Sequence, residues 1–250
     1  MSAANSTFIE IKELTKTFGS IKALKALNKI SLQFSGSVIH GIVGPAGAGK
    51  TTLLRIMLEL LKADSGSVTY NFNGAKIPFS DIRTDIAYMP QQQSLYADLS
   101  IEEHMMFFAN LYGIDNKEYE KLSEHLYKIT RLGKFKDRPA GKLSGGMYKK
   151  LGLMCTLLRS PKIILLDEPT NGVDPISRRE FWEILHDTAG NNVLIIMTTA
   201  YMDEVERCGC VHLMEKGELL DSGEPQQLLA KEGVENFDQF FIKRALDKMK

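Results

Sequence analysis

A glycine-rich turn between an apolar run and a helical pattern constrains this chain more than any other feature of its sequence. The run Val38–Val43 predicts a buried strand, and the stretch Lys50–Leu61 has the periodicity of a helix. Three of the six residues between them are glycines, at positions 44, 47 and 49. A strand that passes through such a turn into a helix begins a βα unit, so we expect a sheet with parallel strands.

Two later apolar runs extend this pattern. Ile163–Leu166 and Val193–Met197 are typical of strands buried on both faces, and Ser177–Thr188 between them predicts a helix. The chain has 250 residues, about 1.7 times a common domain size, and 44% of them are hydrophobic. We therefore predict an α/β fold, built as one large domain or as two closely joined lobes.

The segment from Gln92 to Leu158 has a helical texture instead. Ser100 and Glu103 fit a capping box, after which apolar residues recur at helical spacing. Apolar residues 105–108 are expected to lie in the core or to form part of a docking surface. The C-terminal helix is expected to pack on its own domain rather than on a partner. Further helices are predicted over Glu118–Leu132 and Met147–Arg159. The predicted parts are a core lobe (1–91 and 159–225) with an antiparallel β portion near the N-terminus, a helical subdomain (92–158) and a C-terminal helix (226–250).

The glycine-rich turn also predicts a binding chemistry, because residues 44–51 match G-x-x-x-x-G-K-[ST] at every fixed position. Glycines let backbone amides converge on phosphate oxygens, and the start of the following helix adds a favourable field. Lys50 is expected to reach the outer phosphates, and the Thr51 hydroxyl to bind Mg²⁺. The predicted phosphate-binding residues are Gly44, Pro45, Ala46, Gly47, Ala48, Gly49, Lys50, Thr51 and Thr52.

A second motif supplies the acids that such a loop requires. The run Ile163–Leu166 is followed by Asp167 and Glu168. At the end of a strand, Asp167 can join the Mg²⁺ shell, and Glu168 can polarise a water for in-line attack. The alternative interpretation is a buried strand that simply ends in exposed acids with no role in binding. The phosphate-binding motif at Gly44 makes this alternative less favourable.

Charge and composition exclude several other classes of protein. Lys and Arg number 31, as do Asp and Glu, so a chain that mainly coats nucleic acid or anionic lipid is disfavoured. No apolar run approaches the ~18 residues of a membrane-spanning helix, and we see no secretory signal at Met1–Glu10. The three cysteines suit a reducing cytosol. Cys208 and Cys210 resemble half of a metal site, but with no second pair we expect structural roles.

An ordered set of further motifs resembles the ABC-type ATPases. Residues 143–147, Leu-Ser-Gly-Gly-Met, resemble the family's signature sequence, with Met147 where glutamine is commonest. Phe18-Gly19 resembles the aromatic loop that stacks on adenine, Gln91 the Q-loop and Asp174 the D-loop. The resemblance covers essentially the whole chain and is greatest to exporter ATPases of the multidrug kind. Some of these carry two ATPase halves in one chain, so the 250 residues could be one half of a longer protein.

The resemblance implies a fold, a reaction and partners. The fold would be the ABC ATPase architecture: a P-loop NTPase (RecA-like) core lobe, an antiparallel β subdomain and an inserted helical subdomain. The cofactors would be ATP and Mg²⁺, with Glu168, Lys50 and Gln91 catalytic and Thr51, Gln91 and Asp167 at the metal. Two such domains would sandwich the nucleotides and move integral membrane permease subunits on the cytoplasmic face of the membrane, with no nucleic acid bound. The remaining nucleotide-binding residues implied are Phe18, Ser144, Gly145, Gly146 and Asp174.

One departure from the family bears on the rate of hydrolysis. Ala200 stands where the family usually has a histidine that donates a hydrogen bond to the γ-phosphate. Losing one preorganised donor to transition-state charge typically costs about 3–4 kcal/mol, so we expect a slow site. Thr198 and Thr199 are candidate replacements, but a β-branched residue one position away would need a shifted backbone.

Three competing classes fit less well. A GTPase needs an Asn-Lys-x-Asp motif, and Asn116-Lys117-Glu118-Tyr119 fails at its fourth position. A chromosome or DNA-repair ATPase inserts a long coiled coil, whereas only 144 − 91 = 53 residues separate Gln91 from Ser144. A soluble, non-transport module such as a translation factor is the alternative that stays open, although the neutral charge disfavours it.

Overall fold

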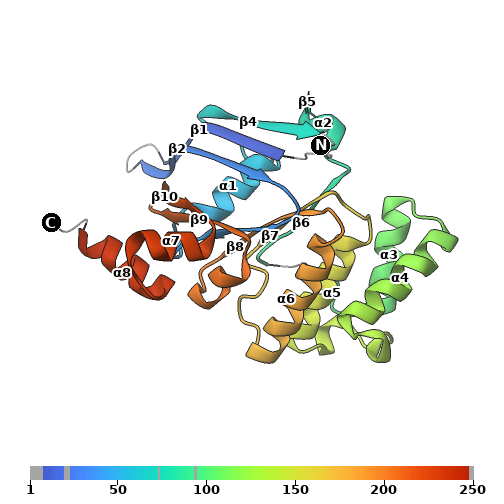
Figure 1. Cartoon of the computed structure of the whole chain (residues 1–250). Coiled ribbons are helices and arrows are strands. Elements are labelled where there is room, and N and C mark those ends of the chain that lie inside the picture. Colours follow the sequence, from blue (N-terminus) through green and yellow to red (C-terminus); the bar gives the residue numbers. More distant parts are fainter. Residues whose placement is uncertain (1–7, 20–22, 73, 93–94, 248–250) are drawn as a thin grey trace, which may run out of the picture. The chain divides into compact units, whose positions relative to one another are not determined.

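The computed structural model describes residues 8–19, 23–72, 74–92 and 95–247 (Figure 1). The chain divides into two compact units, residues 1–81 with 196–250 (unit 1) and residues 82–195 (unit 2). Strands β6 (Ile86–Met89) and β7 (Ile163–Asp167) and helix α6 (Pro175–Ala189) fall in unit 2. The limits predicted for the helical subdomain, 92–158, stay a prediction.

Unit 1 contains an antiparallel sheet with strand order β2-β1-β4-β5, which accounts for the antiparallel portion expected near the N-terminus. β1 is irregular along β2, with register shifts between Ile11 and Thr17. Its inward side chains include Ile9, Ile11 and Leu14, each at most 1% exposed. The strands are β1 (Phe8–Phe18), β2 (Leu24–Ser35), β4 (Ser65–Phe72) and β5 (Ala75–Ile77), and the short helix α2 (Phe79–Ile82) follows them.

A second sheet of unit 1 has the order β10-β9-β3-β8, in which β9 runs parallel to β3 and antiparallel to β10. All five residues of β3 are buried, as expected of a strand covered on both faces. The helix after β3 was predicted to reach Leu61 but ends at Met57. The elements are β3 (Ile39–Val43), α1 (Lys50–Met57), β8 (Leu194–Thr199), η3 (Met202–Arg207), β9 (Cys210–Glu215) and β10 (Glu218–Gly223).

The early end of α1 has a local cause. Glu59 adopts a left-handed conformation, with φ of 52°. Its amide donates to the Ile56 carbonyl at 3.0 Å, and the Leu60 amide donates to the Arg55 carbonyl at 2.9 Å. These two bonds form a Schellman motif, which closes a helix end and usually has glycine at the left-handed position. With glutamate there, the sequence carried no stop signal.

The C-terminal segment of unit 1 forms two helices where the sequence predicted one over 226–250. Helix α7 (Pro225–Glu232) ends at Gly233, whose φ of 66° is left-handed, and α8 (Phe237–Asp247) follows. Phe237 and Phe240 are at most 1% exposed, which confirms packing on the own domain for these two. Arg244 forms ion pairs with Glu232 and Asp221. Met249 lies outside the described residues.

Unit 2 consists of the parallel strands β6 and β7, the first two residues of β8, and helices that Figure 1 shows as one group. Every residue of β7 is buried, and Trp182 and Phe181 are the largest side chains of its core. The capping box at Ser100 is confirmed: its hydroxyl accepts from the Glu103 amide, and the Glu103 carboxylate accepts from the Ser100 amide. The elements are β6 (Ile86–Met89), α3 (Ile101–Tyr112), α4 (Asn116–Thr130), η1 (Gly133–Phe135), η2 (Ala140–Lys142), α5 (Gly145–Leu157), β7 (Ile163–Asp167) and α6 (Pro175–Ala189).

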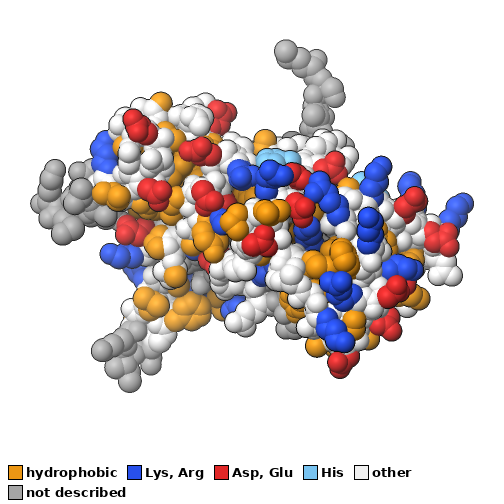
Figure 2. Space-filling view, turned by 90° about the horizontal axis from the view of Figure 1, so that it is seen from below, with side chains coloured by type: hydrophobic (Ala, Val, Ile, Leu, Met, Phe, Trp, Pro, Cys, Tyr) orange, Lys and Arg blue, Asp and Glu red, His pale blue; other side chains and the backbone are white. Residues whose placement is uncertain are grey.

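The surface of the helices in unit 2 carries charges of both signs. Figure 2 shows Lys and Arg side chains interspersed with Asp and Glu over the right-hand part of the face it presents. A part-buried ion pair joins α5 to α6, since Lys150 bonds Glu180, which also bonds Arg131 at 2.9 Å. Among the described residues, no helix combines the length and the apolar content needed to cross a membrane.

Candidate functional site

The glycine-rich loop of unit 1 leads from the end of β3 directly into α1. Gly47 and Gly49 have φ of 79° and 102°, which side chains other than glycine rarely adopt. Gly49 is also the N-cap of α1 and provides no side-chain bond to the helix start. The first amides of a helix lack acceptors within the helix, so this end suits an anion such as phosphate. The loop therefore has the backbone form that the motif predicted.

Two of these glycines differ in their surroundings, which gives a matched stability test. A Cβ on Gly49 would lie 2.3 Å from the Ala26 carbonyl oxygen, whereas a Cβ on Gly47 would meet nothing within 4 Å. Gly47→Ala should lower the free energy of unfolding by only about 1–2 kcal/mol, because of its positive φ. Gly49→Ala adds backbone overlap and should cost about 2–5 kcal/mol in all. Urea denaturation measures both, and equal losses would contradict this account.

Lys50 is held over the loop by its own backbone. Its ammonium donates to the carbonyls of Gly44 at 2.7 Å and Pro45 at 3.1 Å, and the residue is 4% exposed. A buried lysine with such partners is fixed in direction rather than free to swing. The structure thus places the charge of Lys50 beside the glycine loop, where the motif requires it, with Thr51 and Thr52 in the first turn of α1.

The end of β8 lies next to the start of the loop. The Gly44 amide donates to the Thr199 carbonyl at 3.2 Å, and Ala200, which follows, is exposed. The Thr199 hydroxyl donates to the buried Glu204 carboxylate at 2.6 Å and accepts from the Tyr201 amide at 3.0 Å. Thr199 is therefore committed to its own turn, which makes it a poor replacement for a donor at position 200.

The acidic residues of unit 2 converge with Gln91. Glu168 follows β7 in a left-handed conformation, with φ of 44°, an unusual backbone state that is common at functional sites. Its carboxylate accepts from the Gln91 side-chain amide at 2.8 Å and from Asn171 at 3.4 Å. Asp167 is 1% exposed and accepts from the Tyr88 hydroxyl at 3.5 Å. The structure thus brings Gln91 and Glu168 together.

This donor set fits a magnesium ion. Mg²⁺ prefers oxygen ligands, and Asp167 and Gln91 offer a carboxylate and an amide oxygen. The amide nitrogen of Gln91 faces Glu168, which leaves its oxygen as the potential ligand. Sequence reasoning missed three neighbours: Tyr88, Asn171 and Lys149, whose ammonium donates to the Gln91 carbonyl at 2.9 Å. All three lie three residues from a predicted site residue, Tyr88 from Gln91, Asn171 from Glu168 and Lys149 from Gly146.

The serine-glycine segment starts α5 and packs against the loop before α6. Ser144 is the N-cap of α5, and its hydroxyl accepts from the Met147 amide at 3.3 Å. A Cβ on Gly146 would lie 2.3 Å from the Ser177 hydroxyl, so only glycine allows this approach. Asp174 caps α6 by accepting from the Ile176 and Ser177 amides, and the amide of Ser177 chiefly holds the pKa of Asp174 below its usual value. The structure thus joins Gly146 to the Asp174 loop.

Phe18 ends β1 with its ring partly exposed. The ring is 40% exposed, and the Lys16 ammonium lies 5.6 Å from its centroid. An exposed aromatic face at the end of a strand is available for stacking on a planar ring such as adenine. Gly19 is described, but the residues that follow it, 20–22, are not.

A glycine-lined loop with Lys50 at a helix start, and a buried strand that ends in Asp167 and is followed by Glu168, are the features of a P-loop NTPase. The model of the ABC transporter family matches residues 27–171. The chain belongs to this family, and it is an ATP-binding ATPase domain of the ABC class.

Several known proteins resemble the chain over most of its length. It is 44% identical over 230 residues to YbhF of Escherichia coli strain K12, which is named a probable multidrug ABC transporter ATP-binding protein. The aligned residues cover 90% of this chain and 39% of YbhF. It is 31% identical to the Nod factor export ATP-binding protein I of Sinorhizobium fredii, covering 88% of this chain and 64% of that protein. The chain thus spans about two fifths of YbhF.

Solved structures agree with the fold. The structure of cbiO1 from Clostridium perfringens, described as part of the ABC transporter complex cbiONQ, matches with a TM-score of 0.78 and 26% identity; the match covers 90% of this chain and 91% of that chain. An ATP-binding subunit of an ABC transporter has a TM-score of 0.79 at 24% identity, covering 94% and 98%. These matches bear out the predicted ABC ATPase architecture.

Proposed function

We propose that this chain is the ATP-driven motor of an exporter, in which ATP binding closes a pair of ATPase domains and hydrolysis releases them. Lys50 and the amides of residues 44–52 would hold the phosphates of Mg-ATP, and Phe18 would stack on adenine. Thr51, Gln91 and Asp167 would hold Mg²⁺, which when bound offsets phosphate charge. Glu168 would orient and deprotonate the attacking water. The exporter assignment rests on the names of the relatives, and drugs or other small amphiphiles are the proposed cargo.

The observation that carries this proposal is that the chain builds two separate glycine-bearing helix starts. Helix α1 begins after Gly49, and α5 begins with Gly145 and Gly146 behind the cap Ser144. Both present backbone amides suited to phosphate oxygens. In the arrangement that the family resemblance implies, one domain supplies the first helix start and its partner the second to the same ATP. Two domains must therefore pair to complete each ATP site.

A charge at the second helix start tests the pairing. In a non-hydrolysing Glu168→Gln background, we expect ATP to associate two ATPase domains, as measured by light scattering, and Ser144→Arg to abolish association. ATP affinity measured by fluorescent-nucleotide binding should change less than about threefold, because Lys50 is untouched. Asp115→Ala is the control, since Asp115 likewise caps a helix, α4, by accepting from the Glu118 amide at 2.9 Å. Association that survives Ser144→Arg contradicts the sandwich.

The helices of unit 2 offer the proposed contact with permease subunits. Of residues 105–108, Met105 is fully buried, whereas Met106 is 51% and Phe107 is 40% exposed. Tyr96, 55% exposed, packs its ring edge-on against Phe107 at 5.4 Å. Met105 thus belongs to the core, whereas Met106 and Phe107 are exposed and could form part of a docking surface. Tyr96, Met106 and Phe107 are the proposed docking residues, on the cytoplasmic side of the membrane.

A pull-down from solubilised membranes separates transport from the non-transport alternative. We expect the wild-type chain to retain integral membrane proteins, and Phe107→Ser to weaken that retention while leaving ATP binding intact. Leu24→Ser is the control, because Leu24 is 68% exposed but lies on β2 in unit 1. Copurification with ribosomes instead of membrane proteins would favour a translation-factor-like module.

A further inference from the structure

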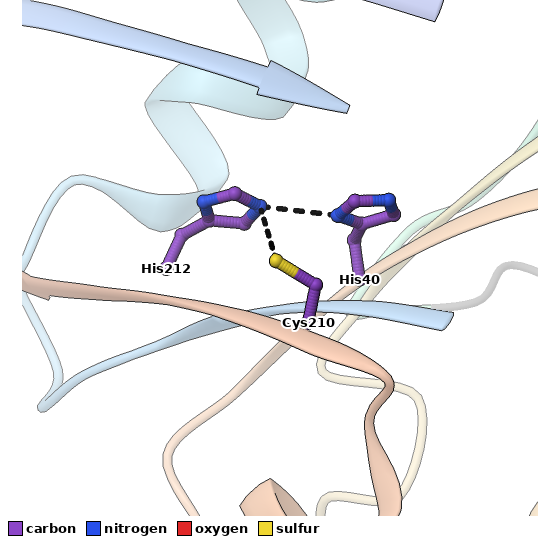
Figure 3. A group of neighbouring side chains, drawn as sticks. All are labelled: His40, Cys210 and His212. Atoms are coloured by element: carbon purple, nitrogen blue, oxygen red, sulfur yellow. Dashed lines mark hydrogen bonds between the residues drawn. The ribbon is translucent and has the colours of Figure 1, made fainter. Parts of the chain in front are cut away.

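Strands β3 and β9 of unit 1 bring three potential metal ligands together outside the nucleotide-binding residues. His40 lies on β3, and Cys210 and His212 lie two residues apart on β9, with Cys210 in register with His40. Nδ1 of His40 is 3.2 Å from Nε2 of His212, which is 4.0 Å from Sγ of Cys210. All three atoms lie within 4.8 Å of one another and turn toward a common point (Figure 3).

These separations are close to those of a tetrahedral zinc site. Zinc bonds of about 2.05 Å to nitrogen and 2.3 Å to sulfur require about 3.3 Å between two nitrogens and about 3.6 Å between nitrogen and sulfur. The observed 3.2 Å between the two ring nitrogens meets the first requirement, and the 4.0 Å between Nε2 of His212 and Sγ of Cys210 exceeds the second by about 0.4 Å. Two imidazoles and one thiolate are a ligand set for zinc or copper ions.

In metal-bound histidines, the ring nitrogen that does not bind the metal usually contacts a backbone carbonyl or a polar side chain. The corresponding nitrogens of His40 and His212 have such partners here. Nε2 of His40 lies 2.9 Å from the Ser35 carbonyl oxygen and 3.2 Å from the Ser35 amide. Nδ1 of His212 lies 3.0 Å from the Ser222 hydroxyl. Ser35 and Ser222 therefore orient both rings with their inner nitrogens facing each other.

Ser35 serves both protonation patterns of His40. In the tautomer with Nδ1 protonated, the Ser35 amide donates to Nε2, and Nδ1–H of His40 donates to His212. With a metal, the proton would sit on Nε2 and be donated to the Ser35 carbonyl, which frees the Nδ1 lone pair. The ring stays neutral in both cases, so a metal would displace only the thiol proton of Cys210.

Burial favours neutral ligands, and the cysteine provides access. His40 and His212 are 3% and 2% exposed, with the Phe34 ring edge-on to both. Burial lowers the pKa of both rings, that of His212 to about 3, so they hold lone pairs at neutral pH. Cys210 is half-buried, and burial and then the Glu224 carboxylate raise the pKa of its thiol.

We propose that His40, Cys210 and His212 form a binding site for one zinc ion, with Ser35 and Ser222 orienting the histidines. The ion would link β3 to β9, and so would clamp the strand that leads into the glycine-rich loop. It would leave a fourth position for water or a nearby carboxylate. Zinc binding at this site would not require ATP, and it would raise the free energy of unfolding of the chain.

Cobalt substitution in the full chain tests the proposal without nucleotide. After chelator treatment, one equivalent of Co²⁺ should produce a thiolate-to-cobalt charge-transfer band, which Zn²⁺ in turn should abolish. Cys210→Ser should lose the band and weaken Zn²⁺ binding at least about 100-fold. Cys208→Ser is the control: Cys208 lies two residues from Cys210, but it is buried and its thiol donates to the Glu204 carbonyl at 3.7 Å. The band should persist in Cys208→Ser.

A variant outside the ligand set guards against misfolding. Ser222→Ala removes only the partner of His212 and should weaken Zn²⁺ affinity about 10- to 100-fold while the cobalt band persists. Zn²⁺ should also raise the Tm of the wild type and not that of Cys210→Ser. Absence of the band in the wild type, its survival in Cys210→Ser, or its loss in Cys208→Ser would each overturn the proposal.

Discussion

Replacing Ala200 with histidine should raise the rate of ATP hydrolysis by about 100- to 1,000-fold in a single-turnover measurement with the protein in excess over ATP. The physical reason is the missing donor: alanine offers no hydrogen bond to the charge that builds on the γ-phosphate. The structure supports this position, because the Gly44 amide bonds the Thr199 carbonyl directly before it. Ala200 is exposed, so a larger side chain fits without displacing the core.

The control for this variant places a histidine elsewhere on the same segment. Glu206 is exposed and lies in η3, so Glu206→His tests whether any added imidazole accelerates hydrolysis. It should leave the rate unchanged. If Ala200→His hydrolyses ATP within a factor of two of the wild type, the slow-site hypothesis is wrong. A domain with a slow site fits an exporter in which a different ATPase domain carries most of the turnover.

Glu168→Gln should reduce hydrolysis by about 100- to 10,000-fold while ATP binding stays intact, because an amide cannot accept the proton of the attacking water. The change keeps the shape of the side chain, and the left-handed backbone at Glu168 is unaffected. Single-turnover hydrolysis and equilibrium ATP binding measure the two effects separately. Glu168→Gln is best measured also in the Ala200→His background, because the faster rate expected of the Ala200→His parent widens the measurable range.

Glu118→Gln is the control for the loss of a carboxylate in unit 2, because Glu118 is exposed on α4. It should hydrolyse ATP at the parent rate. Retention of more than about a tenth of the parent rate by Glu168→Gln would show that another group activates the water, and the contact of Gln91 with Glu168 would then have a positioning role only.

Local features were predictable where near neighbours in the chain decide them. The capping box at Ser100 and the strand at Ile163 followed from short patterns, because a cap or a strand depends on residues three or two apart. The end of α1 did not follow, since Glu59 occupies a position that usually signals itself with glycine. The single helix predicted over 226–250 is interrupted at Gly233, a left-handed glycine of the kind that commonly ends a helix.

The sequence predicted which residues belong to the site better than it predicted the contacts that their side chains make. Asp174 and Ser144 were predicted to bind nucleotide, and in the structure both cap helices with their side chains. The two roles agree for Ser144, whose cap builds the helix start that would face phosphate. Residues 105–108 carried the same apolar character, yet only the packing of α3 separates buried Met105 from exposed Met106 and Phe107.

The sequence by itself determined the loop, the acidic strand and the order of the family motifs, because each is a contiguous stretch whose backbone form and chemistry are set locally. Only the tertiary structure decided which distant side chains meet. Gln91 reaches Glu168 across 77 residues, and His40 reaches His212 across 172. Such pairs depend on strand register and on the packing of elements far apart in the chain, which no short-range pattern encodes.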